Sequence, residues 1–565
     1  MKSKKMLTVW GCLLLMLVFL FNACTGNTPS NNNTTVSDSA SAEEPVTPSN
    51  PVRMVELVTN GKANYKIIIS ENATEELMVT VNSLKSKLRE ITGEIFYAYD
   101  DYTKDGQPID GTGEIVIGDC KRTEAQNELA TLRYKDYTVK ITESNILIMA
   151  HNDANTRKAI NAFIDMLDQS NIESNGETIS LKWTGDILHR GNYVTSVPTL
   201  ADVPLSSFTI VYPSDITDDY AMALREAYAK RFGDFLPVVS DATPETQYEI
   251  LLGKTNRTLS QSVYAADMAP DYMEYYFTAD RGKLLVASGG LFSLEQAVEQ
   301  LGLFFSTSST KVEDLIAKGS TNLLTDPIQS CTADYRFMSY NILVEYEGWG
   351  SGGDIPPEVE IRKEITASLI LNYKPDVACL QEVYETWHAN LPELIESNYG
   401  FVEATRTDGS KNRTLLIYNK SRLKVVKSGY LDLEDVVTSN KRVVVWAVFE
   451  DLETSARFAA FGTHWSSVGG EEVKVVEAGR TAELVKQITA QYSVPSVMMG
   501  DLNSVGEAVT AYATQSGHTK GVANGVDHIF YSSDTLQLVY QETVTGNCAK
   551  YASDHRPIFF DVNLK

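Results

Sequence analysis

The sequence predicts an α/β protein with a two-sheet α/β sandwich over residues 334–565, preceded by two small repeated α/β modules. Three observations predict this organisation. Apolar strand-like runs alternate with segments of helical periodicity, one such pattern occurs twice between Tyr65 and Phe305, and after Tyr335 several apolar runs end in polar residues. With 565 residues, the chain also exceeds the length that one hydrophobic core usually serves, so several domains are expected.

The chain begins with a basic and apolar leader. Three lysines within the first five residues precede a nearly continuous apolar run from Leu7 to Phe21, as is typical of an export signal. The end of this leader, Phe21-Asn22-Ala23-Cys24, resembles the bacterial lipobox, although Phe21 and Asn22 depart from that pattern. The resemblance implies a lipoprotein signal peptide over residues 1–23 and a lipid on Cys24, which would anchor an exported protein on the outer side of a bacterial cell membrane. An ordinary cleaved signal and an uncleaved anchor are the alternatives.

A low-complexity segment and a strong negative charge set limits on the partners. Residues 24–60 are predicted to be a flexible tether, because most of them are Ser, Thr, Asn and Pro and cannot build a core. The formal net charge is -25 at pH 7, which repels nucleic-acid phosphates and anionic membranes unless metal ions or a local basic patch intervene. This excludes a strongly basic DNA-coating protein.

The region between the tether and the sandwich contains an internal duplication, with copies at residues 61–190 and 200–310. Each copy reads strand, helix, short strand, and a stronger strand ending in glycine, as in Glu114–Gly118 and Glu249–Gly253, and each glycine is followed at the same offset by Arg-Thr. The pattern resembles the accessory N-terminal domain of alpha-glucuronidases and beta-hexosaminidases. The resemblance implies a glycan contact, with a structural spacer or a protein-contact module as the alternative. Residues 311–333 are predicted to be a linker.

From Tyr335 onward, polar residues of one chemical kind follow apolar strand-like runs, where catalytic groups on α/β scaffolds tend to lie. Asp501 and Asn503 are two residues apart, so in an extended chain they share a face. The candidate residues, in chain order, are Asn341, Glu382, His464, Asp501, Asn503, Asp527, Asp554 and His555.

Taken together and in this order, the Gln-Glu, Gly-Asp-x-Asn and Ser-Asp-His signatures resemble those of the endonuclease/exonuclease/phosphatase family, which includes deoxyribonuclease-like enzymes. The resemblance implies a phosphoester hydrolase that uses Mg²⁺ or Mn²⁺ and attacks phosphorus in line with activated water. The metal residues that it implies are Asn341, Glu382 and Asp554. The catalytic residues that it implies are His464, Asp501, Asn503, Asp527 and His555, with Asp527 orienting His555 and either Asp501 or His555 as the base.

The substrate is left open by the sequence. The family resemblance implies foremost an extracellular nuclease or phosphodiesterase. Acidic residues outnumber basic ones in residues 334–565, which disfavours long duplex DNA, so the expected substrates are short or single-stranded nucleic acid or small phosphoesters. A sphingomyelinase-like lipid phosphodiesterase or a phosphatase is the alternative among enzymes. A surface lipoprotein that binds a glycan or a partner is the alternative of another class.

Overall fold

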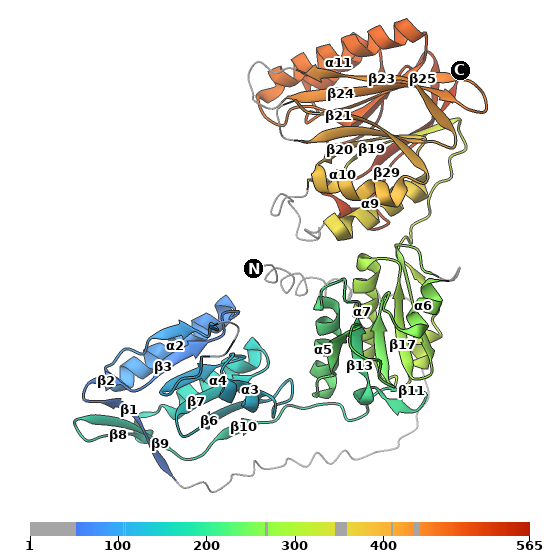
Figure 1. Ribbon diagram of the computed structural model, residues 1–565. Helices are drawn as coiled ribbons and strands as arrows, with labels where there is room; N and C mark the ends of the chain where they lie inside the picture. Colours follow the sequence, from blue (N-terminus) through green and yellow to red (C-terminus); the bar gives the residue numbers. More distant parts are fainter. Residues whose placement is uncertain are drawn as a thin grey trace, which may run out of the picture. The chain divides into compact units, whose positions relative to one another are not determined.

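The computed structural model describes residues 52–104, 107, 109–265, 269–344, 359–407, 411–433 and 441–565 (Figure 1). The predicted signal peptide, Cys24 and most of the predicted tether lie outside the described residues. Among the helices that are described, none combines the length and the apolarity needed to cross a membrane.

The first module contains a mostly parallel six-stranded sheet with helices on both faces. Its apolar residues alternate along the strands, so Ile67 and Ile69 pack on one face of the sheet with two helices, while Ile68 faces a third helix on the other side. The sheet has the order β10 (Ile187–His189), β6 (Tyr137–Ile141), β7 (Asn145–Ala150), β5 (Glu114–Ile117), β3 (Lys66–Ile69), β4 (Ala98–Asp100). The helices are α2 (Glu75–Thr92), α3 (Thr123–Leu129) and α4 (Asp153–Met166).

The second module repeats this order of elements. Its sheet has the order β14 (Val238–Ser240), β13 (Thr209–Tyr212), β15 (Glu249–Leu252), β17 (Lys283–Ser288), β16 (Glu274–Asp280), β18 (Thr321–Asn322). Its helices are α5 (Asp219–Phe232), α6 (Thr258–Tyr264), α7 (Leu291–Phe305) and α8 (Glu313–Ile316). Read from its other edge, this sheet matches the first strand for strand, with β13 in the place of β3 and β18 in the place of β10. The match supports the proposed duplication.

Two predicted boundaries need correction. The predicted tether over residues 24–60 contains β1 (Arg53–Thr59), which pairs antiparallel with β9 (Thr178–Trp183) because its apolar side chains Val55 and Leu57 are buried. The predicted linker over residues 311–333 contains α8 and β18, and β18 pairs with β16 through Glu274 and Tyr275. Both segments are short and polar on one face, so their composition resembles that of a loop.

The C-terminal domain consists of two six-stranded sheets. One has the order β21 (Tyr399–Thr405), β22 (Arg413–Asn419), β20 (Val377–Val383), β19 (Tyr335–Asn341), β30 (Ile558–Leu564), β29 (Leu536–Thr543). The other has the order β23 (Leu423–Leu433), β24 (Arg442–Asp451), β25 (Arg457–His464), β26 (Ser496–Asp501), β28 (Asp527–Tyr531), β27 (Thr519–Asn524). The helices are α9 (Val359–Tyr373), α10 (Glu385–Ile395), α11 (Gly470–Tyr492), α12 (Glu507–Ser516) and α13 (Ala549–Ala552).

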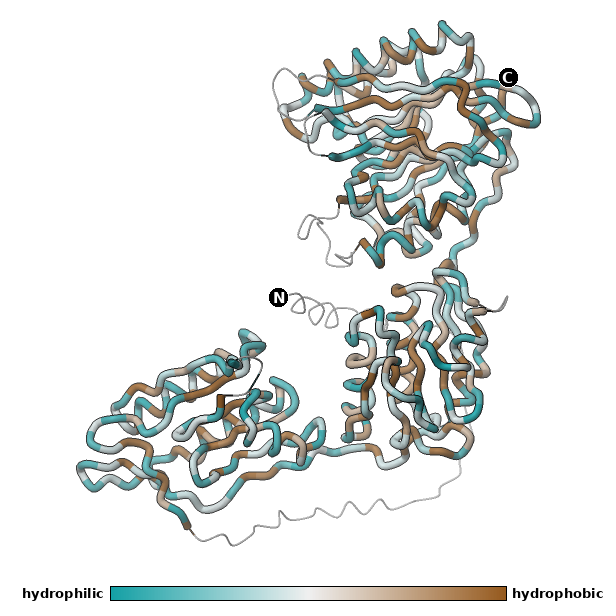
Figure 2. The backbone as a smooth tube through the Cα atoms, viewed as in Figure 1, coloured by the Kyte–Doolittle hydropathy of each residue, from teal (hydrophilic) through white to brown (hydrophobic). Residues whose placement is uncertain are grey.

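The two sheets pack face to face, with helices on the outside. Side chains from both inner faces, including Phe337, Cys379, Val445 and Phe458, form one buried core between the sheets. The outer face of one sheet packs against α9 and α10, and that of the other against α11 and α12. Figure 1 shows α9 and α11 on opposite sides of the strands, and Figure 2 shows hydrophobic segments along the strands between them. The predicted fold class, a two-sheet α/β sandwich, is confirmed.

Candidate active site

The candidate residues meet at one end of the sandwich, where strands from both sheets end. Because β19 and β20 are parallel, Asn341 lies opposite Gln381, next to Glu382. In the other sheet, β25 and β26 are parallel, so His464 lies opposite Asp501. The next strand runs antiparallel, which places Asp527, its first residue, opposite Asp501 on the other side. The site therefore lies across the strand ends of the two sheets.

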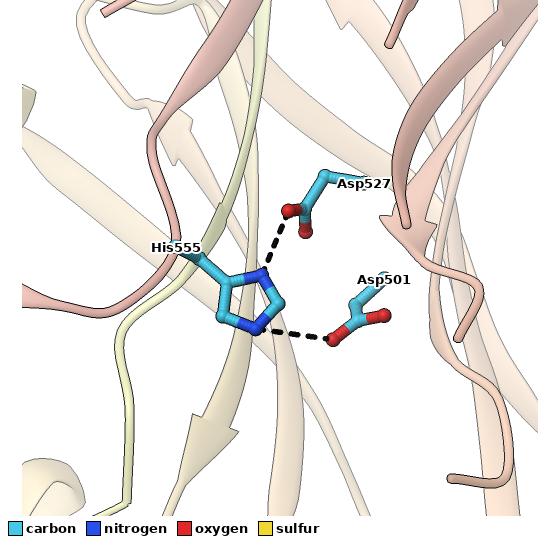
Figure 3. A group of neighbouring side chains, drawn as sticks. All are labelled: Asp501, Asp527 and His555. Carbon is cyan, nitrogen blue, oxygen red and sulfur yellow. Dashed lines mark hydrogen bonds and ion pairs between the residues drawn. The ribbon is translucent and has the colours of Figure 1, made fainter. Parts of the chain in front are cut away.

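Two carboxylates contact the two nitrogens of one histidine (Figure 3). His555, in the loop before β30, lies with Nδ1 2.7 Å from Asp527 Oδ2 and with Nε2 3.8 Å from Asp501 Oδ2. Because Asp527 accepts, Nδ1 of His555 carries a proton. The two aspartates are almost fully buried, whereas His555 is only partly buried. The Asp527–His555 pair thus has the geometry of an oriented acid–base group beside a second carboxylate.

Burial and neighbouring charge alter the protonation of this group. Burial and the charge of Asp527 raise the pKa of Asp501 to about 6. Burial alone would lower the pKa of His555, but the hydrogen bond and charge of Asp527 outweigh it and raise the pKa of His555 to about 10. Near neutral pH, His555 is therefore an imidazolium, and Asp501 changes its protonation state close to neutrality, where a general base is most effective.

An irregularity in β20 directs Glu382 into the site. The pairing of β20 with β22 shifts register between Leu380 and Val383, and Glu382 itself has φ 65, a conformation that side-chain-bearing residues seldom adopt. Such bulges redirect side chains and are common beside active sites. Glu382 Oε1 accepts a hydrogen bond of 3.2 Å from Asn341 Nδ2, and Oε2 accepts one of 2.8 Å from the backbone N–H of Val344.

The residues proposed to hold a metal are only partly assembled by direct contacts. Asn341 Nδ2 also donates to Asp501 Oδ2 at 3.0 Å, so Asn341, Glu382 and Asp501 form one connected group. Asp554 is exposed and follows Ser553, whose hydroxyl donates to the backbone carbonyl of Asn341 at 2.7 Å. Asn341, Glu382 and Asp554 can each offer a side-chain oxygen as a metal ligand, and oxygen is the ligand atom that Mg²⁺ and Mn²⁺ prefer. The donor set therefore fits a hard divalent cation.

His464 and Asn503 complete the group on the side of β25. His464 Nε2 lies 3.6 Å from Asp501 Oδ2. The backbone N–H of Asn503 donates to Asp501 Oδ1 at 2.9 Å, whereas its side-chain amide donates to the carbonyl of Trp465, also at 2.9 Å. Asn503 thus orients Asp501 through its backbone and anchors the chain after β25 through its side chain.

Two buried arginines beside His464 were missed by the sequence analysis. Arg406 follows β21 and Arg442 begins β24, and both side chains are nearly inaccessible to solvent. Arg406 Nη2 lies 3.2 Å from His464 Nδ1. Neither arginine comes directly after a buried apolar strand, because β21 is largely half-buried and Arg442 is the first residue of β24, so the sequence holds no comparable signal for them.

The sandwich and its polar strand ends define a class of domain. A family model described as the endonuclease/exonuclease/phosphatase family matches residues 338–555, so the C-terminal region contains a domain of that family. The activities in this description all cleave phosphoric esters.

Named relatives are similar to this same region. Nocturnin of Rattus norvegicus is 23% identical over 280 residues, which cover 40% of this chain, and the chain spans 65% of the length of that relative. The human nocturnin catalytic domain with bound sulfate is 22% identical and covers 41% of this chain and 94% of its own, with a TM-score of 0.36. An endonuclease/exonuclease/phosphatase from Bacteroides vulgatus is also 22% identical and covers 41% of this chain and 99% of its own, with the same TM-score.

Proposed function

We propose that the C-terminal domain is a divalent-metal-dependent phosphoester hydrolase, with a nuclease or phosphodiesterase activity foremost. The observation that carries this proposal concerns His555. Its Nε2 lies 3.8 Å from Asp501 Oδ2, and its Nδ1 is hydrogen-bonded to Asp527. Hydrolysis of a phosphoester needs a group that takes a proton from water and a second that stabilises the developing charge. These two groups are present side by side.

Asn341, Glu382 and Asp554 are the proposed metal residues, with Mg²⁺ or Mn²⁺ as the ion. When bound, such an ion neutralises phosphate charge and lowers the pKa of a coordinated water. Among these residues, Glu382 is the one whose carboxylate is already oriented, because the bulge in β20 and two hydrogen bonds fix its direction. Asn341 links this carboxylate to Asp501, so the metal residues and the base share one network.

The remaining polar residues have separate proposed roles. Asp501 orients water and accepts its proton, since its raised pKa of about 6 makes it a stronger base than an exposed aspartate. His555, held by Asp527, carries a positive charge close to the scissile phosphate and can donate a proton to the leaving oxygen. His464 donates a hydrogen bond to a phosphoryl oxygen, and Asn503 keeps Asp501 in place.

The proposed substrates are short or single-stranded nucleic acid or small phosphodiesters. Duplex binding draws mainly on Lys and Arg that neutralise phosphates, and residues 334–565 contain more acidic than basic side chains. We also propose that the protein is lipid-anchored through Cys24 outside the cell, and that the two modules contact a glycan or a partner. The leader and tether sequences support the first of these two proposals, and the resemblance of the modules supports the second.

The experiment that tests the function measures hydrolysis of bis-p-nitrophenyl phosphate, p-nitrophenyl phosphate, single-stranded DNA, duplex DNA, RNA and sphingomyelin. Turnover of diesters and single strands is expected with Mg²⁺ or Mn²⁺, and none with excess chelator. Asp501→Ala and His555→Ala should each remove most of the turnover. Full activity in chelator would refute the role of the metal, and cleavage of sphingomyelin alone would replace the proposed substrate by a lipid.

A further inference from the structure

The two histidines of the site have opposite neighbours. His555 Nδ1 contacts a carboxylate, that of Asp527, at 2.7 Å. His464 Nδ1 instead contacts a guanidinium, with Arg406 Nη2 at 3.2 Å. A guanidinium carries only hydrogen-bond donors and does not lose its proton in proteins, so in this contact Arg406 donates and His464 Nδ1 accepts. A nitrogen that accepts has no proton of its own. His464 is therefore a neutral ring whose proton is on Nε2.

The other nitrogen of that ring, Nε2, points toward Asp501 and the reaction centre. His464 Nε2 lies 3.6 Å from Asp501 Oδ2, on the side where Asp501 also contacts Asn341 and approaches His555. A neutral imidazole with its proton on Nε2 can donate a hydrogen bond to a negatively charged oxygen at this place. It cannot take a proton from water at Nε2, so the structure separates the task of His464 from that of Asp501.

The surroundings of His464 favour the same state. Burial and the charges of Arg442 and Arg406 lower the pKa of His464 well below its usual range. Arg442 Nη2 donates to Ser467 Oγ at 3.2 Å, so it also holds the chain that follows His464. The two arginines come from different sheets, Arg406 after β21 and Arg442 at the start of β24.

We propose that Arg406 is a positioning residue that holds His464 as a neutral ring with its proton on Nε2, so that Nε2 donates a hydrogen bond to a non-bridging oxygen of the phosphoryl group. The part of this proposal that concerns the phosphoryl group rests on the proposed hydrolase function. The part that concerns the tautomer rests on the contact between Arg406 and His464 alone. Arg406 touches no reacting atom in this scheme and acts only through His464.

The tautomer is tested without any activity measurement. The full-length protein labelled with ¹⁵N-histidine contains only 7 His residues, and the spectrum of His464→Gln identifies the signals of His464. In the wild type, Nδ1 of His464 should show an unprotonated shift and Nε2 a protonated one, unchanged from pH 5.5 to pH 8. In Arg406→Met, no donor fixes Nδ1 as the acceptor, so the two ring nitrogens of His464 should show the averaged shifts of two neutral tautomers. A wild-type His464 with a proton on Nδ1 would overturn the proposal.

The functional part is tested by a double-mutant cycle on whichever substrate the wild type hydrolyses. Removing the outer partner of a metal-ligating histidine typically costs about 10- to 100-fold in activity, and by analogy Arg406→Met should lower kcat by about that factor and change KM little. Arg406→Lys, which keeps a charged donor, should lose less than about 5-fold by the same reasoning. In the His464→Gln background, Arg406→Met should cost no more than about 2-fold, since coupled residues are not additive.

A matched control is Arg457→Met, which changes an exposed arginine at the opposite end of the same strand as His464 and should leave turnover unchanged. Thermal melting of each variant separates loss of fold from loss of function, and Arg406→Lys remains informative if Arg406→Met does not fold. If Arg406→Met lowers kcat as much in the His464→Gln background as in the wild type, Arg406 acts directly or only structurally and not through His464, which would overturn the proposal. If the wild type hydrolyses no phosphoester, the proposed function fails, while the spectra still decide the tautomer.

Discussion

Replacing Asp501 by Asn should abolish turnover and yet stabilise the fold at neutral pH. Asp501 is 2% exposed, and its pKa rises from 3.8 to about 6. The folded protein therefore binds a proton more tightly at this site than the unfolded chain does. The contribution of Asp501 to stability is therefore largest below pH 3.8, falls as the pH rises between the two values, and is lost above about pH 6.

The size of the effect follows from the shift. About two pKa units at about 1.4 kcal/mol each correspond to about 3 kcal/mol of lost stability at pH 7.5. Asn cannot accept both hydrogen bonds that Asp501 receives, from Asn341 and from the Asn503 backbone, and one lost hydrogen bond costs about 1 kcal/mol. The free energy of unfolding of Asp501→Asn should therefore exceed that of the wild type by about 2 kcal/mol at pH 7.5.

The assay is urea denaturation with excess chelator, because a bound cation would stabilise the ionised carboxylate of the wild type. At about pH 4 the advantage of Asp501→Asn should vanish or reverse, since the wild-type carboxyl is then protonated in the folded state. Asp534→Asn, which changes an exposed aspartate in a turn, should behave like the wild type at both pH values. A less stable Asp501→Asn at pH 7.5 would refute the reasoning that burial destabilises this carboxylate.

Three further predictions concern the metal residue, the acid–base pair and the leader. Glu382→Gln should keep the fold but raise the Mg²⁺ or Mn²⁺ concentration at half-maximal activity by about 10- to 100-fold, measured by titration of the metal; an unchanged midpoint would exclude Glu382 as a ligand. Asp527→Asn should lower kcat by about 10²- to 10⁴-fold. The pKa of His555 is raised to about 10, so the ion pair with Asp527 contributes its full stability below about pH 6.5 and loses it as the pH rises through about 10. The melting temperature of Asp527→Asn should therefore lack the part of its decrease at alkaline pH that this pair causes in the wild type. The same decrease in both proteins would contradict the ion pair. Cys24→Ser should move the protein from the membrane fraction to the soluble fraction, and unchanged fractionation would rule out lipid attachment.

The sequence identified several of the residues that meet at this end of the sandwich, because each lies at one end of an apolar run that is recognisable as a buried strand. His464, Asp501 and Asp527 could be found in this way, since burial on both faces of a strand leaves a clear apolar signature, which comes before His464 and Asp501 and after Asp527. Their mutual contacts could not be found, because the register of β26 with β25 and β28 decides which side chains lie opposite one another.

Other features had no separate signature in the sequence. The bulge that turns Glu382 inward arises from a register shift between two strands, and residues on one strand alone do not specify it. Arg406 lies in an ordinary charged stretch, and only the packing of two sheets brings it to His464. The strand β1 was assigned to a tether, because four of its seven residues are exposed or partly exposed.

The hydrogen bond from Asn341 to Asp501 joins the last residue of β19 in one sheet to the last residue of β26 in the other. The two halves of the sandwich are therefore linked at the site itself, and separation of the sheets at this end breaks the site before it exposes the core. Occupancy of the site should in turn slow amide hydrogen exchange at the ends of strands in both sheets, including strands that contact no ligand. Exchange rates at β19 and β26 would thus report on any molecule that binds there, even one that is never hydrolysed.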